Sequence, residues 1–181
     1  MAPAPGRKLD YSFIAATPND GKRYELIDGV LLVNPSPSPI HQRVLRRLSE
    51  QLTAYFHPRA IGEVFFAPLD VILTPHDVFE PDLIVVGDPS HISHRGIEAP
   101  PLLAVEILSP STRRVDLGVK FARYAKLGIQ HYWIVDPDAE RVGCFRLADD
   151  EFKLVVSSSD DASLRHPDWD GLVVDLAALW S

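Results

Sequence analysis

Three short and almost uninterrupted apolar runs limit what this chain can fold into. They are Leu83–Val86, Leu102–Leu108 and Tyr132–Val135, which carry the sequences LIVV, LLAVEIL and YWIV. Runs of this length are typical of strands, and a strand that is apolar on both faces has to be covered on both faces. The sequence therefore predicts an α/β sandwich in which helices flank a mixed sheet of about six to eight strands.

Two hairpins are predicted, one near each end of the domain. Asp28-Gly29 separates two strand-like segments within 23–33, and an Asp-Gly pair in this setting is the strongest short-range signal for a hairpin turn. A second pair of strand-like segments, within 142–156, flanks an acidic turn and is interpreted as a closing hairpin.

Two helices are predicted between the hairpins. Ser38-Pro39 is typical of a helix start, and apolar residues recur at every fourth position over 39–56. The second helix is expected over about 112–127, after a Ser-Pro-Ser-Thr segment that favours helix initiation. Its predicted apolar stripe is Leu117, Phe121 and Tyr124.

Three predicted strands lie between these helices and a fourth follows the second helix. They cover 62–73, bent near Pro68, then 80–86, 102–108 and 132–135. The resulting core order is α-β-β-β-α-β, with an N-terminal hairpin and a C-terminal hairpin extension. This order does not alternate strictly and contains no glycine-rich phosphate loop, which excludes Rossmann and P-loop folds.

The length of 181 residues favours a single domain, which we expect over 12–181 after a disordered leader over 1–11. No segment has the apolar length of a membrane span or of a secretory signal, and the lone Cys144 is typical of a reducing compartment, so we expect the protein in the cytoplasm. The net charge of −7 argues against indiscriminate binding of nucleic acid, which needs a basic surface.

Two carboxylates stand where a packed protein does not normally place them. Asp82 opens one apolar run and Glu106 interrupts the next. Burial of an ionised carboxylate is costly unless a cation or hydrogen bonds compensate. Two such groups in adjacent strands predict a shared partner, and a divalent metal ion is the simplest one.

At these residues the chain resembles the Uma-two family of restriction endonucleases, within the PD-(D/E)xK, restriction-endonuclease-like superfamily. The segments that carry the resemblance are RYELIDGVLL, SPIH, EPDLIVV, PPLLAVEILSPSTRRVDLGVKFARYAKLG, HYWIVDP and GLVVDLAALW. The resemblance implies that Asp82, Glu106 and the main-chain carbonyl of Ile107 bind Mg²⁺ or Mn²⁺. Such an ion activates water for attack on a phosphodiester.

The chain departs from the superfamily motif at one position, where Leu108 replaces the lysine expected two residues after the acid. We hypothesise that Lys120 substitutes for it from the following helix. If that helix packs back along the sheet, Lys120 and Glu106 come level to within several ångströms, with rises of about 3.3 Å per strand residue and about 1.5 Å per helix residue. We expect Lys120→Met to abolish cleavage and to leave folding and metal binding largely intact.

Other candidates have two interpretations each. Glu25 is either a further acid near the metal or a solvent-facing strand residue. His41, at a helix N-terminus, either contacts a substrate phosphate or serves as a cap or surface residue. Arg113 and Arg114 either bind substrate, in a basic patch, or belong to a solvated helix face. Asp116 either joins the site or forms an ordinary surface ion pair with Lys120.

The leading hypothesis is a Mg²⁺- or Mn²⁺-dependent endonuclease that acts on DNA, with a homodimer to cut both strands. One alternative is an interaction or inhibitory module that keeps the fold without efficient catalysis, which the missing in-strand lysine and the acidic charge favour. Another is a phosphodiesterase acting on a small nucleotide. The spacing of His91 and His94 could suit zinc, but a surface loop is the favoured interpretation.

Overall fold

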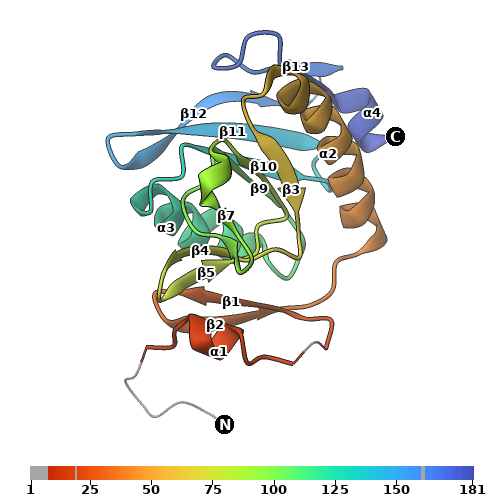
Figure 1. Ribbon diagram of the computed structural model, residues 1–181. Helices are drawn as coiled ribbons and strands as arrows, with labels where there is room; N and C mark the ends of the chain where they lie inside the picture. Colours follow the sequence, from red (N-terminus) through yellow and green to blue (C-terminus); the bar gives the residue numbers. More distant parts are fainter. Residues whose placement is uncertain (1–7, 19, 160–161) are drawn as a thin grey trace.

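The centre of the molecule is a six-stranded mixed sheet (Figure 1). In spatial order its strands are β12 (Glu151–Ser158), β11 (Arg141–Ala148), β10 (His131–Asp136), β9 (Leu103–Ile107), β6 (Leu83–Val86) and β3 (Glu63–Phe66). β9 and β10 run parallel, and the other neighbouring pairs are antiparallel. The computed structural model describes residues 8–18, 20–159 and 162–181.

Both faces of this sheet are covered, as the three apolar runs predict. β6, β9 and β10 are buried at every position. One face packs against α2 (Pro39–Arg59) and α4 (Leu176–Trp180). The other packs against a π-helix, η2 (Val115–Lys120), and its continuation α3 (Phe121–Lys126). The order α2, β3, β6, β9, η2–α3, β10 is the expected α-β-β-β-α-β core.

A second six-stranded sheet, which the sequence did not predict, packs against the side of the first that carries α3. In spatial order its strands are β2 (Val30–Asn34), β1 (Arg23–Ile27), β5 (Asp77–Phe79), β4 (Val71–Thr74), β8 (Gly96–Ile97) and β7 (Ile92–Ser93). Val71, Phe79 and Ile97 of this sheet share a core cluster with Ile84 of β6 and Tyr124 of α3. The second sheet therefore borders the part of the core that also contains β6 and α3.

The prediction of one long strand over 62–73 is wrong. β3 ends at Phe66 and pairs with β6, whereas β4 begins at Val71 and pairs with β5 in the second sheet. Pro68 lies between them, and proline has no N–H to give to a ladder, so a continuous strand ends there.

Both predicted hairpins are present, and their turns show why. Asp28 and Gly29 have φ values of 52° and 79°, and Asp149 and Asp150 have 53° and 60°. Two consecutive residues with positive φ are what a tight hairpin turn requires, and Asp and Gly adopt them more readily than most residues.

The remaining elements are α1 (Tyr11–Ile14), η1 (Pro89–His91) and a two-stranded sheet of β13 (Ser163–Arg165) and β14 (Val173–Asp175). Residues 1–7 of the predicted leader lie outside the described residues. After them, the Leu9 amide donates to the Gly29 carbonyl over 3.0 Å, and the Asp10 side chain caps α1. None of the described helices has the length and apolar character needed to cross a membrane.

Candidate active site

Asp82 and Glu106 lie on the same face of the central sheet. Asp82 directly precedes β6 and Glu106 is in β9, and the antiparallel register of these strands pairs Ile84 with Ala104. Side chains two residues apart in a strand point to the same face, so both acids extend the row formed by that pair. Each is 2% exposed. The structure therefore places the two predicted acids side by side in the interior.

Asp82 is held by three donors. Its Oδ1 accepts from Arg23 Nη1 at 2.6 Å, and its Oδ2 lies 3.0 Å from His41 Nε2 and accepts from the Ile107 amide at 2.8 Å. Burial alone would raise the pKa of Asp82, but His41, Arg23 and the amide outweigh burial and lower the pKa. The carboxylate is therefore kept ionised by its neighbours.

Lys120 extends from η2 into the same interior. Its Nζ lies 3.0 Å from Glu106 Oε1, 2.9 Å from Glu25 Oε1 and 3.6 Å from Asp116 Oδ1. Burial alone would lower the pKa of Lys120, but Glu106, Glu25 and Asp116 outweigh burial and raise it. Lys120 therefore contacts Glu106 from the following helix, as the hypothesis from the sequence requires.

The helix that carries Lys120 differs from the predicted one in its first half. Residues 115–120 form a π-helix, and the α-helix covers 121–126. In this geometry Asp116 and Lys120 both face the interior, whereas Leu117, expected on the buried stripe, is 46% exposed. π-Helical turns are rare and occur frequently at functional sites.

Glu25 belongs to the same cluster and is fully buried, so the interpretation as a solvent-facing strand residue is wrong. Its carboxylate accepts from the Glu80 amide at 2.8 Å and from the Asn34 side chain, in addition to its ion pair with Lys120. Asp116 is 1% exposed, so it does not form an ordinary surface ion pair either.

Tyr124 of α3 completes the surroundings of Glu106. Its hydroxyl donates to Glu106 Oε1 over 2.8 Å. Burial raises the pKa of Glu106 well above its ordinary value; Lys120 opposes this shift, whereas Asp116 and Asp82 add to it. The ionised form of Glu106 is therefore only partly compensated by its surroundings.

The donor set suits a hard divalent cation. The acid cluster contains the buried carboxyl groups of Asp82, Glu106, Glu25 and Asp116, which carry four negative charges when ionised. Lys120 and Arg23 supply two positive charges, which leaves a formal excess of two negative charges beside oxygen ligands of the kind that Mg²⁺ and Mn²⁺ prefer. The oxygens of Asp82 and Glu106 are also engaged by protein donors, so an ion has to compete with these donors.

A pocket reaches the cluster at Asp82. A pocket of about 230 Å³ is lined by residues that include Arg23, His41, Pro68 and Asp82. His41 is 4% exposed, and its ring contacts Asp82, so it is neither a surface residue nor only a helix-capping one.

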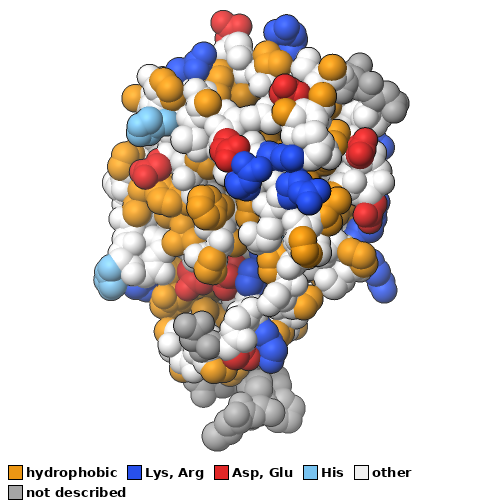
Figure 2. All heavy atoms as spheres, turned by 90° about the vertical axis from the view of Figure 1, so that its right-hand side faces the viewer, with side chains coloured by type: hydrophobic (Ala, Val, Ile, Leu, Met, Phe, Trp, Pro, Cys, Tyr) orange, Lys and Arg blue, Asp and Glu red, His pale blue; other side chains and the backbone are white. Residues whose placement is uncertain are grey.

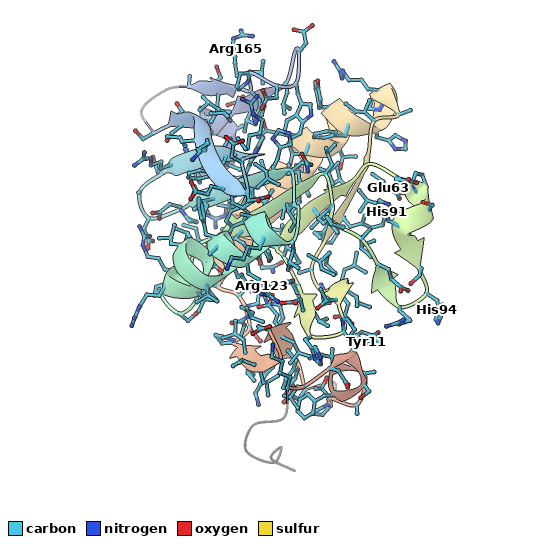
Figure 3. All side chains as sticks on the ribbon, turned by 90° about the vertical axis from the view of Figure 1, so that its left-hand side faces the viewer. Tyr11, Glu63, His91, His94, Arg123 and Arg165 are labelled. Atoms are coloured by element: carbon cyan, nitrogen blue, oxygen red, sulfur yellow. The ribbon has the colours of Figure 1, made fainter. Side chains whose placement is uncertain are left out.

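Two other predicted candidates lie outside the cluster. Arg113 forms an ion pair with Asp136 at 2.8 Å, and Arg114 is exposed. Arg123 (Figure 3) bridges α3 to the second sheet through Asp77 at 2.7 Å. His91 and His94 lie apart at the outer edge of the molecule and do not point toward one another (Figure 3).

Sequence inspection did not assign Arg23 or Tyr124 to the site, although both left a signal. Arg23 stands two residues before Glu25 in a predicted strand, so their side chains share a face. Tyr124 stands four residues after Lys120 in a predicted helix. Glu25, the partner of Lys120 in the second sheet, was a candidate from the sequence, but its pairing with Lys120 was not predicted, because that sheet was not predicted.

The sequence and the fold of this chain are similar to those of known proteins. A family model, Uma2, described as “Putative restriction endonuclease”, matches residues 10–177. Among solved structures, the chain is similar to the crystal structure of “a putative nuclease belonging to DUF820” from Anabaena variabilis ATCC 29413. The TM-score is 0.76 and the sequence identity 22%, over 95% of this chain and 97% of that chain. The curated proteins gave no match. The shared fold confirms the predicted architecture of mixed sheet and flanking helices.

Proposed function

Because the chain belongs to the Uma2 family, as its sequence motifs predict, we propose that it is a divalent-metal-dependent endonuclease that hydrolyses DNA phosphodiester bonds. One observation carries the proposal: Lys120 reaches Glu106 from a helix, on the sheet face that also holds Asp82. Folding alone does not require a lysine buried among three carboxylates, because burial of charges is costly.

In this proposal Asp82, Glu106 and the Ile107 carbonyl hold Mg²⁺ or Mn²⁺. The bound ion supplies a water of lowered pKa and charge to offset the phosphate. The Lys120 ammonium stabilises negative charge that develops on the phosphate. Glu25 and Asp116 act on Lys120, which they position and keep protonated.

Arg23 and His41 orient Asp82 in the proposed site. Both contact its carboxylate and both line the pocket of about 230 Å³, through which a phosphate can approach. A second pocket of about 540 Å³, lined by Arg43, Arg46 and Phe66 among others, shares Gln42 and Leu45 with the first. We propose that the DNA backbone lies along these arginines of α2.

The charge distribution supports this path. The face that carries α2 shows a group of Lys and Arg side chains (Figure 2), although the chain as a whole has a net charge of −7. A local basic patch is sufficient to attract a phosphate backbone. For two cuts in a duplex we propose a homodimer, and Leu154, which is 54% exposed on the edge strand β12, offers apolar surface for it.

The test is a cleavage assay with Mg²⁺ or Mn²⁺ on supercoiled plasmid, single-stranded DNA, RNA and a small phosphodiester. We expect DNA cleavage that EDTA abolishes and that Asp82→Asn and Glu106→Gln each reduce by about 10² or more. Glu63→Gln, at an exposed acid of β3, is the matched control and should leave the rate unchanged. Thermal unfolding of each variant separates loss of the site from loss of the fold.

A second candidate function, a binding module without catalysis, is favoured by the pairing of Asp82 with Arg23 and of Glu106 with Lys120 within the protein. Calorimetry with Mn²⁺ distinguishes the two. Mn²⁺ binding without turnover of any substrate supports the module, and turnover of the small diester alone supports a nucleotide phosphodiesterase. Absence of Mn²⁺ binding in the wild type contradicts the metal site.

A further inference from the structure

A group of three metal-ligating side chains lies away from the acid cluster. His131 is the first residue of β10, and His166 and Asp168 lie in the loop that follows β13. Trp133, two residues along β10 from His131, packs in the core on the α2 side, whereas Tyr132 packs on the α3 side with the acid cluster. Because side chains alternate along a strand, His131 faces the α2 side.

The ligand atoms of this group converge. One ligand atom from each of the three side chains lies within 4.8 Å of the other two, and His131 Nδ1 is 3.9 Å from Asp168 Oδ2. Among the residues that the structure describes, no other group of three or more His, Cys, Asp and Glu side chains meets this spacing.

Each of these three side chains also has a polar atom that lacks the hydrogen bond normal for a buried polar group. His131 Nδ1, His166 Nε2 and Asp168 Oδ2 are buried and have no hydrogen-bond partner within the described part of the chain. His131 is 7% exposed and His166 4%. Most buried polar atoms in proteins are hydrogen-bonded, and an exception calls for a physical cause such as an ion. Three exceptions on side chains that converge are most simply explained by a single cause.

We therefore propose that His131, His166 and Asp168 form a transition-metal site, which suits Zn²⁺ best. Two imidazoles and one carboxylate are a set that Zn²⁺ binds, with water in the fourth position, whereas Mg²⁺ prefers oxygen ligands alone. The proposal does not depend on the nuclease function, because the site uses none of the residues of the acid cluster.

The surroundings hold the imidazole pair in place. Burial lowers the pKa of His131, and burial together with His131 lowers the pKa of His166 to about 4. The Trp169 ring lies 4.3 Å from each imidazole. Arg146 Nη1 holds the other carboxylate oxygen of Asp168 at 2.5 Å, as a partner outside the ligand shell often does.

Binding changes one hydrogen bond. The Asp168 amide donates to His166 Nδ1 over 3.2 Å, which leaves the proton of the neutral ring on Nε2. Coordination through Nε2 places that proton on Nδ1, so the contact with the amide has to open. A contact of this length is at the weak end of hydrogen bonding, and its loss is small beside the gain of a metal bond. The ion would tie the loop after β13 to the first residue of β10.

The test uses the untagged full-length protein and Zn²⁺ alone, measured by calorimetry, with Co²⁺ as a spectroscopic probe. We expect one Zn²⁺ per chain, a rise in Tm with Zn²⁺ but not with Mg²⁺, and the intense visible absorption of tetrahedral Co²⁺. His166→Gln and Asp168→Asn should weaken Zn²⁺ binding more than tenfold. His94→Gln, at an exposed histidine, should not.

Asp82→Asn separates this site from the acid cluster, and Zn²⁺ binding should persist in it. Circular dichroism of each variant shows whether it folds. If His166→Gln does not fold, the Zn²⁺ affinity of Asp168→Asn is the deciding measurement. Equal Zn²⁺ affinity in the wild type and in Asp168→Asn overturns the proposal. Loss of the Zn²⁺ site in Asp82→Asn, or no binding in the wild type, overturns it as well.

Discussion

Lys120 is buried among carboxylates: its ammonium lies between Glu25 and Glu106, with Asp116 nearby. Because Lys120 is buried, a substitution there should change the free energy of unfolding as well as activity. Removal of one partner from a buried ionic group leaves charges without compensation, which typically costs about 3–5 kcal/mol. The expectation from sequence that Lys120→Met leaves folding intact therefore has to be revised.

We predict that Lys120→Met lowers the free energy of unfolding by about 3–5 kcal/mol and reduces DNA cleavage by about 10² or more at temperatures where the variant is folded. Urea unfolding and the plasmid assay measure the two effects. Lys126→Met, at an exposed lysine of α3, is the matched control and should change neither. Full activity of folded Lys120→Met would remove Lys120 from the proposed mechanism.

Glu80, which donates its amide to Glu25, provides a prediction about pH. Its side chain is 9% exposed, and burial, followed by Asp70 and Glu25, raises its pKa from 4.5 to about 7. The folded protein therefore keeps this proton to higher pH than the unfolded chain does. The contribution of Glu80 to the free energy of unfolding falls as the pH rises from about 4.5 to about 7.

Glu80→Gln keeps the shape of the protonated side chain and cannot ionise. We predict that it is more stable than the wild type at pH 8, by about 1–3 kcal/mol, and that the difference disappears near pH 4. Denaturant unfolding at both pH values checks this. Glu63→Gln, at an exposed position, should show no such difference, and equal stability of Glu80→Gln and the wild type at pH 8 would contradict the prediction.

Among the elements, η2 determines whether Lys120 faces the acids. Gly118 lies in the middle of this π-helix, is exposed, and an added Cβ there would meet no atom within 4 Å. Glycine in a helix costs about 0.5–1 kcal/mol relative to alanine, because it loses more backbone freedom on folding. The position is therefore open to a stabilising change that does not touch the site.

We predict that Gly118→Ala raises the free energy of unfolding by about 0.5–1 kcal/mol and leaves cleavage unchanged. Deletion of Gly118 has a different effect, because it shortens the spacing between Asp116 and Lys120 and turns one of them away from the interior. Its expected result is a helical but inactive protein. Circular dichroism and the plasmid assay compare the two variants, and an active deletion variant would show that the π-helical geometry is not needed.

Some elements could be predicted because their signal is local. The apolar runs of β6, β9 and β10 show burial on both faces, and Ser38-Pro39 marks the start of α2. Asp82 and Glu106 stood out for the same reason, since a charge inside an apolar run is visible without a structure. Lys120 was a candidate because the family resemblance implies a lysine near the acids, and helix geometry allowed Lys120 to reach Glu106.

Other features could not be predicted because they depend on distant pairing. β5 and β8 are too short to show a pattern, so the second sheet was not predicted, and neither was the pairing of Glu25 with Lys120 that it produces. The π-helix Val115–Lys120 consists of residue types that also occur in α-helices, so its composition does not distinguish it from an α-helix. His131 and His166 lie far apart in the chain and meet only through the packing of the loop after β13 on β10.

For the whole molecule, the contrast between net charge and local charge matters most. The chain is acidic overall, so in the proposed function the patch on α2 supplies the attraction to DNA. We predict that Arg43→Glu weakens DNA binding about equally for all sequences. It should also make the salt dependence shallower, reducing the magnitude of the slope of log affinity against log salt by about 1. Arg165→Glu, at an exposed arginine of β13, is the control. A sequence-dependent loss in Arg43→Glu would contradict a backbone contact.

The division of the core into two sides has a consequence for optical measurements. All three tryptophans, Trp133, Trp169 and Trp180, belong to or pack against the core cluster beneath α2. The acid cluster is bordered instead by Tyr124 and Tyr132. Indole fluorescence therefore reports on one half of the protein and is blind to the half that carries Lys120. A second probe on that half is needed to establish whether both halves unfold in one step.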